Sequence, residues 1–379
     1  MRNLGLYVHI PFCISKCPYC DFYSETIKNK NIVEKYLSAL QKEIKIYSSK
    51  YNQPNIASIY IGGGTPTILT EKQISSIIYL CFEYFKIKNN IEITIESNPA
   101  TFNYSKAVNL IKTGINRISI GAQSFNNSLL SNIGRIHNKK DILNSYQIAR
   151  TVGFNNINID LMFGLPGQTI NDLLDSLKTA ITLSPEHISA YGLSVEPNTT
   201  FHHLYKKGLL NIPESDAFYE MYAKTINYLK SEGYNHYEIS NFARKGFKCS
   251  HNIIYWKNNE YLGVGASSTS YINKSRFRNI SNLGQYINLL KQNILPIEYQ
   301  ETLPLKEEMS ETIILSLRML KGFSKNNFNK RFKMPAASFF GEQLEYLKKQ
   351  GLLSETKKNY HLTKKGVFLA NIAFLEFID

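Results

Sequence analysis

Three cysteines lie close together near the start of the sequence, and thiols in such a group can hold a metal. Cys13, Cys17 and Cys20 form a C-x3-C-x2-C pattern directly after an apolar run that predicts a strand. Thiolates are soft ligands that select iron–sulfur clusters, zinc or copper(I) over hard cations. Structural zinc sites and ordinary ferredoxin clusters use four protein ligands, whereas no fourth cysteine stands beside these three. Three cysteines on a four-iron cube leave one iron open to an exchangeable ligand, so we expect a 4Fe–4S cluster here.

Zinc is the alternative occupant of the same group, as a zinc knuckle completed by His9 or by a distant side chain. The other two cysteines, Cys81 and Cys249, stand alone, and five cysteines in 379 residues do not make a disulfide framework. In a reducing cytoplasm, a tight group of cysteines indicates a metal site first. Cys81 lies on the apolar face of a predicted helix, where cysteine behaves as a small core residue.

The cysteine group follows the first of six short β-branched runs that alternate with helical patterns. Two of the intervening helices are expected to stop at Gly114 and Gly153, because glycine adopts the left-handed conformation that helix ends use. Repeated strand–helix–glycine–strand units require parallel strands joined by crossover helices. We therefore expect an α/β fold, a partial (β/α)6 TIM-like barrel with chemistry at the carboxyl ends of its strands; an open doubly wound sheet is the competing topology. The six predicted strands are residues 6–10, 56–61, 91–95, 117–120, 157–161 and 187–191.

The composition changes after about residue 300, which indicates a separate C-terminal part. Helical patterns cover residues 307–320, 325–332 and 339–350, and a short strand is expected at 360–362 before a last helix. This order predicts a small helical, winged-helix-like domain. DNA binding is one use of that shape, but fold alone does not give function, and a packing module is the simpler expectation. The expected division is a core barrel over 1–240, a connecting segment over 241–300 and the C-terminal domain over 301–379.

Five motifs in fixed order identify a family. The sequence resembles the radical S-adenosylmethionine (SAM) superfamily, and specifically the branch that contains oxygen-independent coproporphyrinogen oxidase and its haem-chaperone relative. The resemblance covers most of the chain, from residue 4 into the C-terminal domain. The motifs are YVHIPFC at 7–13, CPYCDF at 17–22, GGGTPT at 62–67, GINRISIG at 114–121 and DLMFGLP at 160–166.

The resemblance implies how the open iron is used. In such proteins SAM chelates that iron through its amino and carboxylate groups, and an electron from the reduced cluster cleaves the sulfonium. The cofactor supplies the chemistry, while the protein places it and excludes water. An electron donor is implied if SAM is cleaved. By matched motif, Tyr7, Gly63 and Glu96 correspond to contacts with the cluster-bound SAM. Gly64, Thr65, Gln123, Arg135 and Asp160 correspond to contacts with a second SAM found in the oxidase.

The residue types at these positions suit a polar ligand. A glycine triplet after a strand lets the backbone approach a ligand and offer N–H groups to a carboxylate, although a plain tight turn explains it as well. Glu96 and Asp160 end predicted strands, where they can accept hydrogen bonds from ribose hydroxyls or an ammonium group. Arg135 can meet a carboxylate with its planar fork. A structural ion pair remains the alternative for Arg135 and Asp160.

A second group of interest is the string H-N-x-x-Y-W, which resembles the motif of the haem-chaperone branch. It contains His251, Tyr255 and Trp256, the last being the sequence's only tryptophan. The imidazole of His251 could bind haem iron, and the two aromatic rings could pack on a porphyrin. The alternative is a buried histidine hydrogen-bonded under an aromatic cluster. Cys249 is a second candidate for the iron ligand.

Two departures separate the sequence from the oxidase. The oxidase has a further cysteine two residues after the third cluster ligand, where Phe22 stands here, and it has an N-terminal extension, whereas this chain begins six residues before Tyr7. We therefore predict a haem chaperone that delivers haem to an acceptor protein. Decarboxylation of coproporphyrinogen is the runner-up, and a zinc-stabilised binding protein is the third hypothesis. Whether the protein is an enzyme stays open.

Composition and charge limit the classes of binding partner that we expect. The formal net charge is +14, from 44 Lys and Arg against 30 Asp and Glu, but the basic residues are spread along the chain, so nucleic-acid binding is not expected. Anionic ligands, including one that carries propionates, remain compatible with this charge. No apolar run approaches the roughly 20 residues that span a bilayer, and the first ten residues are too short and polar for a signal peptide. The expected location is the cytoplasm.

Overall fold

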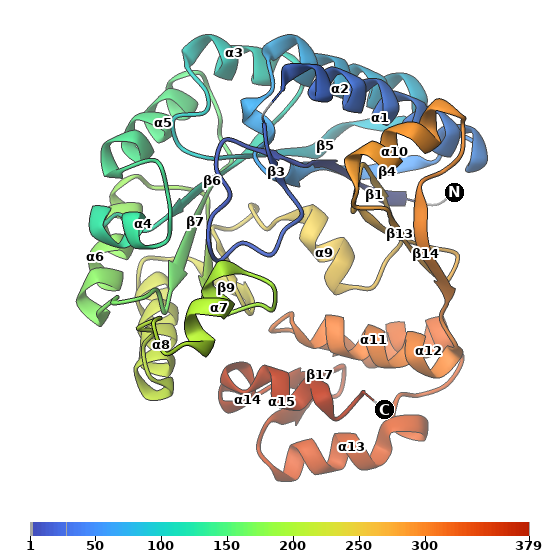
Figure 1. The fold of residues 1–379 in the computed structure, drawn as a ribbon. Helices are drawn as coiled ribbons and strands as arrows, with labels where there is room; N and C mark the ends of the chain where they lie inside the picture. The colour runs from blue at the N-terminus through green and yellow to red at the C-terminus, as the bar shows by residue number, and fades with distance from the viewer. Residues whose placement is uncertain (1–2, 28, 379) are drawn as a thin grey trace.

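A sheet with six parallel strands forms the centre of the computed structural model, which describes residues 3–27 and 29–378 (Figure 1). Each of these strands pairs in parallel with the next one along the chain. All six strands predicted from the sequence are confirmed, with the parallel topology that their spacing required. The strands are β1 (Asn3–Ile10), β4 (Asn55–Gly63), β5 (Lys86–Ser97), β6 (Arg117–Gln123), β7 (Ile157–Phe163) and β8 (His187–Gly192).

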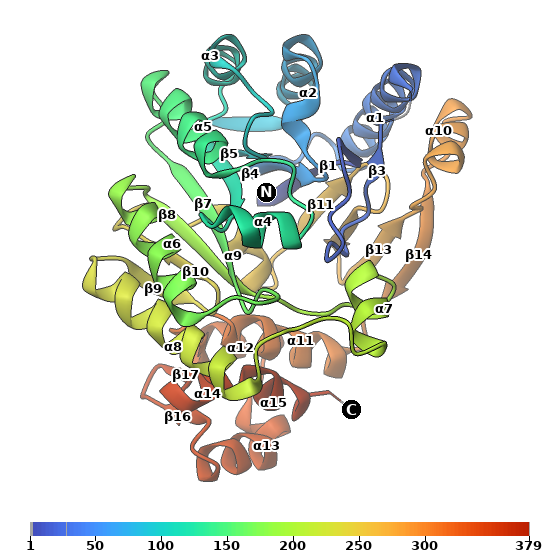
Figure 2. The same ribbon diagram turned by 60° about the vertical axis from the view of Figure 1, so that its left-hand side comes forward.

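Helices cover the outer face of this sheet and lie side by side around its arc (Figure 2). In β1, Leu6, Val8 and Ile10 are fully buried in the core between sheet and helices. Alternate side chains of a strand point to opposite faces, so Tyr7 and His9 point to the concave side. The apolar core therefore lies outside the arc, and polar side chains are left to line its inside. The covering helices are α1 (Lys30–Lys50), α2 (Glu71–Tyr84), α3 (Tyr104–Lys112), α5 (Lys139–Thr151) and α6 (Ile170–Thr182).

Glycines end two of these helices, as the sequence predicts. Gly114 follows α3 with a φ of +95°, and Gly153 follows α5 with a φ of +106°. After α3, the N–H of Ile115 donates back to the carbonyl of Leu110 at 3.2 Å. This is a Schellman-type ending, in which a left-handed residue lets the chain turn and enter the next strand.

The sheet stays open because further strands extend both of its edges. One edge gains a strand parallel to β1 and then three antiparallel strands, while the other gains two antiparallel strands beyond β8. The fold is therefore a partial barrel within a longer mixed sheet. These edge strands were not predicted from the sequence, because they are short and contain no run of β-branched residues. They are β9 (Asn235–Glu238), β10 (Asn241–Ala243), β11 (Tyr261–Val264), β12 (Thr269–Ile272), β13 (Ser275–Asn279) and β14 (Ile297–Thr302).

The C-terminal part is helical with a small sheet, as expected for a winged-helix-like fold. Its strands pair in the order β15-β17-β16, all antiparallel, and β16 and β17 form the hairpin. The helix expected at 325–332 is found with those bounds, whereas the one expected at 307–320 begins and ends earlier. The elements are α11 (Leu305–Leu317), β15 (Phe323–Ser324), α12 (Lys325–Phe332), α13 (Ala337–Lys349), β16 (Leu353–Glu355), β17 (Asn359–Leu362), α14 (Lys364–Phe368) and α15 (Ala370–Leu375).

One short helix, α9 (Ser250–Trp256), lies inside the arc of the sheet instead of on its outer face (Figure 1). Its His251 ring packs against β1, where a Cβ added to Gly5 would lie 3.3 Å from Cε1 of the imidazole. None of the described helices is long and apolar enough to cross a membrane. The remaining elements are β2 (Phe12–Cys13), β3 (Glu25–Thr26), η1 (Pro66–Ile68), α4 (Asn127–Asn132), α7 (Thr200–Lys206), α8 (Ser215–Ser231) and α10 (Leu283–Lys291).

Candidate functional site

A cavity of about 350 Å3 opens at the carboxyl ends of the parallel strands. This is the end at which α/β barrels carry their chemistry, because loops from several strands meet there. Most of the residues singled out from the sequence converge on it. Those that line it are Cys13, Cys17, Cys20, Gly63, Gly64, Glu96, Gln123, Arg135 and Asp160.

The three cysteines lie on the loop between β1 and α1, and all are half-buried free thiols. The N–H of Cys20 donates to the carbonyl of Cys17 at 3.0 Å, so these two share one turn. The Sγ of Cys13 lies 3.5 Å from Oγ1 of Thr65. Burial raises the pKa of the Cys20 thiol, and a bound metal opposes this effect because it deprotonates its thiol ligands.

This donor set fits a 4Fe–4S cluster better than it fits zinc. Among residues 3–27 and 29–378, no three His, Cys, Asp or Glu side chains converge as a single metal ion requires. A zinc ion needs its ligands at about 2.0–2.3 Å from one point, whereas a four-iron cluster spreads its thiolates over separate irons. His9 does not complete a zinc site as placed, because Nδ1 is 3.0 Å from the Tyr7 hydroxyl and Nε2 is 2.9 Å from the Tyr23 carbonyl.

The glycine loop after β4 holds the cysteine loop in place. The N–H of Gly63 donates to Oε2 of Glu96 at 3.0 Å, that of Gly64 to the last carbonyl of β1 at 2.9 Å, and that of Thr65 to the Phe12 carbonyl at 2.7 Å. The expectation that these N–H groups are free for a ligand carboxylate is therefore wrong in this arrangement. A Cβ on Gly64 would lie 2.5 Å from the Phe12 oxygen, so glycine is required by the close approach of the two loops.

Two carboxylates stand on the cavity wall, Glu96 on β5 and Asp160 on β7, with β6 between them. The Tyr60 hydroxyl donates to Oε1 of Glu96 at 2.8 Å, and burial, followed by the charge of Asp160, raises the pKa of Glu96 to about 7. Asp160 accepts hydrogen bonds from Ser119 at 2.8 Å and from Asn158 at 2.7 Å, yet burial still raises the pKa of its carboxyl group. The charge of buried Arg117 lowers the pKa of both groups but does not offset burial, and a bound ammonium or sulfonium group would lower them further.

Arg135 reaches the cysteine loop, and its hydrogen-bonding capacity is only partly satisfied. Its Nη2 donates to Oδ1 of Asn98 at 2.5 Å and to the Gly121 carbonyl at 2.7 Å, while Nη1 lies 3.5 Å from Sγ of Cys17. Its Nε is buried without a hydrogen-bond partner. A buried donor without an acceptor is costly, so this atom indicates that an acceptor is missing from the site.

Gln123 enters the cavity from a strained backbone. Its φ is +64°, and the pairing of β6 with β7 shifts its register between Gly121 and Gln123. A left-handed conformation costs a residue with a Cβ free energy, and bulges of this kind turn a side chain toward a site. The bulge is therefore the local reason why Gln123 reaches the cavity.

Two further predicted residues stand just behind the cavity wall. Thr65 is almost fully buried and accepts a hydrogen bond from Nδ2 of Asn98 at 2.8 Å. The ring of Tyr7 lies 6.3 Å from that of Tyr60, which lines the cavity, and its hydroxyl bonds to His9. Neither is among the residues that line the cavity.

The H-N-x-x-Y-W residues do not belong to this cavity. His251 is fully buried on α9, with Nδ1 2.8 Å from the Ser58 hydroxyl and Nε2 2.8 Å from the Tyr255 hydroxyl. Its ring packs 5.2 Å from that of Tyr60, and burial lowers the pKa of His251 to about 3. Trp256 lies under the guanidinium of Arg318, 4.4 Å from the ring centre. In this arrangement both imidazole nitrogens have protein partners.

Several residues that complete the cavity wall were not predicted from the sequence. Asn98 links Thr65 to Arg135 through hydrogen bonds of 2.8 and 2.5 Å, and Tyr60 fixes Glu96. The signal that could have found them is register: Asn98 stands two positions after Glu96, and Tyr60 two before Gly62, so each shares a face with a residue already noted. Others that line the cavity are Lys16, Tyr19, Ser119, Met162 and Tyr191.

The chain matches two known protein families, both consistent with the site described above. Residues 7–180 match the radical SAM superfamily, and residues 303–369 match the HemN C-terminal domain. The solved structure of coproporphyrinogen III oxidase (HemN) from Escherichia coli, described as a radical SAM enzyme, aligns with a TM-score of 0.87 and 26% identity. That alignment covers 99% of this chain and 90% of the oxidase.

Curated relatives match over nearly their whole length. The heme chaperone HemW of Bacillus subtilis is 38% identical over 373 residues, which cover 98% of both chains. The heme chaperone HemW of Lactococcus lactis is 34% identical over 375 residues, covering 98% of this chain and 96% of the relative. Together with the cysteine cavity on a partial barrel, these matches show that the chain belongs to the radical SAM superfamily and, within it, to the family of the heme chaperone HemW.

Proposed function

We propose that this protein is a haem chaperone that carries a SAM-bound 4Fe–4S cluster. The observation that carries the proposal is the cavity at the carboxyl ends of the strands, where three thiols, two carboxyl groups and one arginine converge. The full-length similarity to proteins named heme chaperone supports haem as the cargo. The proposed place of action is the cytoplasm, and the haem acceptor is a second protein.

Cys13, Cys17 and Cys20 would hold the cluster, and SAM would occupy the cavity beside them. When bound and reduced, the cluster supplies single electrons, which a separate donor protein provides. Glu96 offers an acceptor for a ligand ammonium group, and the unpartnered Nε of Arg135 offers a donor for a carboxylate. Gln123 and Asp160 line the same cavity and are the proposed contacts of a second SAM, together with Gly64 and Thr65.

His251 is the proposed iron ligand for haem, with Tyr255 and Trp256 packing on the macrocycle. Because both of its ring nitrogens are engaged, ligation requires that one partner leave. Metal-bound histidines keep a hydrogen bond from the other ring nitrogen to an oxygen. Ser58 would fill that role at Nδ1, so the Tyr255 hydroxyl is the partner that has to leave Nε2, and α9 would move with it.

The experiment is a haem titration of the reconstituted protein, with and without SAM, followed by the Soret band. A haem chaperone gives saturable binding at one haem per chain. Tyr255→Phe should bind haem more tightly, because it removes the competitor for Nε2, whereas His251→Gln should shift the Soret band. If both variants match the wild type in affinity and spectrum, the iron ligand lies elsewhere, and Cys249 is next to be tested. Absence of haem binding by the wild type contradicts the function itself.

Oxidative decarboxylation of coproporphyrinogen is the alternative; the solved oxidase has the same fold, but the full-length matches to proteins named heme chaperone do not favour it. Phe22 stands where the oxidase has a further cysteine, and its side chain is 69% exposed at the cavity, so no thiol is available there. An anaerobic assay with reductant and SAM tests this candidate. Sustained formation of protoporphyrinogen would favour the oxidase over the chaperone.

A further inference from the structure

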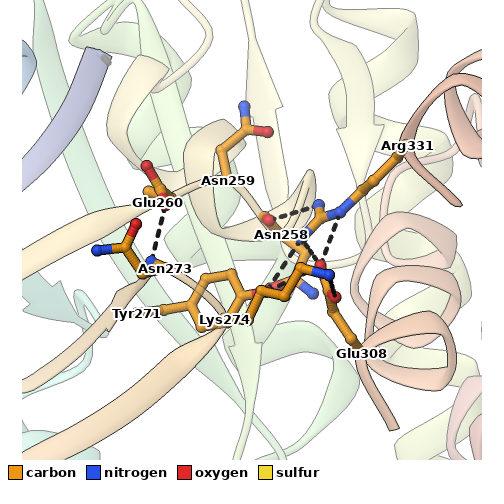
Figure 3. Close-up of a pocket in the computed structure, with 8 residues that line it drawn as sticks. All are labelled: Asn258, Asn259, Glu260, Tyr271, Asn273, Lys274, Glu308 and Arg331. Carbon is orange, nitrogen blue, oxygen red and sulfur yellow. Dashed lines mark hydrogen bonds and ion pairs between the residues drawn. The ribbon is translucent and has the colours of Figure 1, made fainter. Parts of the chain in front are cut away.

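Two cavities flank Arg331 where the loop after α9 meets the C-terminal part. The first, of about 540 Å3, is drawn in Figure 3. Its charges are compensated: Glu308 is almost fully buried and forms ion pairs with Arg331 at 2.8 Å and with Lys274 at 3.4 Å. This cavity offers a ligand no unpaired charge, and its groups hold two parts of the fold together.

Arg331 lines both cavities and separates them. Its Nη1 donates to the carbonyl of Asn258 at 2.7 Å and its Nη2 to the Tyr271 hydroxyl at 3.1 Å, as Figure 3 shows. Asn258 follows α9 closely, and its side chain donates to Thr312 of α11 at 3.0 Å. The end of the H-N-x-x-Y-W segment is thereby fastened to the C-terminal part.

The second cavity, on the other side of Arg331, is a cationic cleft of about 680 Å3. Lys257, Lys321 and Lys330 line it, and all three are exposed. Among the described residues, no aspartate or glutamate lines the cleft. None of the ion pairs found in the described part of the chain involves one of the three lysines. The cleft therefore presents three uncompensated ammonium groups.

Beneath the lysines the cleft has an apolar side. Met319, Phe323 and Phe328 line it, and the two phenylalanine rings pack 5.9 Å apart with little exposure. The volume lies within the roughly 300–1,000 Å3 typical of pockets for drug-sized ligands. Because both phenylalanines are only 3% exposed, the apolar contact in the cleft comes mainly from half-buried Met319. Several cations beside a small apolar surface suit an apolar molecule that carries more than one carboxylate.

We propose that this cleft binds the propionate carboxylates of haem, with Lys257, Lys321 and Lys330 as their partners. The proposal rests on the proposed haem-chaperone function and names a site for its cargo. Lys257 directly follows Trp256, so the cleft begins where the H-N-x-x-Y-W segment ends. No histidine or cysteine lines the cleft, so the site concerns the carboxylates and does not depend on which residue ligates the iron.

The test is a haem titration of the reconstituted full chain carrying Lys257→Glu, Lys321→Glu and Lys330→Glu together. The matched control carries Lys72→Glu, Lys112→Glu and Lys140→Glu, which change the net charge equally on exposed positions of the outer helices. We expect the cleft variant to bind haem at least about tenfold more weakly, because charge-assisted hydrogen bonds become repulsions. The control variant should bind like the wild type.

Haem dimethyl ester, in which both propionates are esterified, provides the second arm. Wild-type affinity should fall with the ester and with added salt, whereas the affinity of the triple glutamate variant should rise with both, because each weakens the repulsion between glutamates and propionates. If the triple glutamate variant fails to fold, the triple glutamine variant should show the same loss in smaller degree. Equal haem affinity in cleft and control variants would overturn the cleft site and leave the chaperone function standing. A wild type that binds no haem would overturn the function itself.

Discussion

The cavity at the cysteine loop and the surroundings of His251 lie on the same side of the sheet, but they differ in how completely the protein satisfies its own polar groups. At the cavity, Arg135 keeps a buried Nε without a partner, and Glu96 and Asp160 have raised pKa values because of burial. At α9, His251 has a partner for each ring nitrogen. The cavity keeps a buried donor that a ligand could satisfy, whereas the imidazole of His251 is already satisfied by protein groups. At the end of α9, only the indole N–H of Trp256 repeats the situation of Arg135, since it is buried without a partner.

Because of this difference, substitutions in the two regions should affect cofactor binding and stability differently. A site that waits for a ligand holds strained or unpaired groups, and these lower the stability of the ligand-free chain. Substitutions in the cavity should therefore remove cofactors while leaving the ligand-free chain intact or more stable. Substitutions around α9 should act first on folding.

The largest effect is expected at the cysteines. Replacing Cys13, Cys17 or Cys20 by Ala should abolish the visible iron–sulfur absorbance of the anaerobically reconstituted protein, because each thiolate holds a different iron. The matched controls are Cys81→Ala and Cys249→Ala, which alter buried thiols outside the cavity and should retain the absorbance. An intact cluster in Cys17→Ala would show that the cavity is not the cluster site.

The next largest effect is a loss of stability expected at His251 on α9. His251→Ala should lower the free energy of unfolding by about 3 kcal/mol, because it leaves a cavity and deprives two buried hydroxyls of their partner. Urea unfolding of the ligand-free chain measures this loss. His203→Ala, at an exposed position of α7, should stay close to the wild type. Equal stability of the two variants would mean that α9 does not contribute to the fold as its contacts indicate.

A smaller effect, of opposite sign, is expected at Glu96. Its pKa of about 7 in the folded chain exceeds the ordinary value of 4.5, so between these values the folded chain keeps a proton that the unfolded chain releases. Stability therefore falls as pH rises through this window and stays low above it. Glu96→Gln should reduce the decline and stabilise the ligand-free chain by about 1–2 kcal/mol at pH 8, while Glu43, whose pKa burial also raises to about 7, maintains part of it. Unfolding curves at pH 5 and pH 8 check this, and a variant as pH-dependent as the wild type would contradict it.

The smallest effect is expected at the strained bulge. Gln123→Gly should stabilise the ligand-free chain by up to about 1 kcal/mol, because glycine adopts a positive φ without steric cost. The same change at Gln147, exposed on helix α5, should destabilise by a similar amount. Thermal unfolding compares the two variants. A loss of stability in Gln123→Gly would show that the side chain contributes more to the fold than its backbone strain removes.

The sequence was most informative where local pattern decides structure. The six parallel strands follow from β-branched runs, and the helix stops from glycines such as Gly114, since both depend on neighbours in the chain. The cysteine spacing and the strand-end carboxylates likewise place the cavity, because parallel strands end at one edge. The surroundings of His251 could not be predicted in this way: Ser58 lies far away in sequence, and only the folded chain brings it to Nδ1.

Two further features could not be predicted from the sequence, because they too depend on contacts between distant parts of the chain. The backbone N–H groups of the glycine loop bond to the cysteine loop, a pairing that depends on how two separate loops meet. The edge strands β11 to β14 are held by pairing with β1 and with one another, and their short sequences, which contain no run of β-branched residues, give little sign of it. Tertiary contacts that choose among several polar partners leave no periodic pattern in a single sequence.

The most direct test of the central claim is the electron paramagnetic resonance spectrum of the reduced, reconstituted protein recorded with and without SAM. If the cavity holds a cluster with one open iron, SAM ligates that iron and the spectrum changes on its addition. His251→Gln should show the same change, because α9 lies outside the cavity, and Cys17→Ala should show no cluster signal at all. A cluster spectrum that stays identical on addition of saturating SAM would contradict the claim that this cavity is completed by SAM.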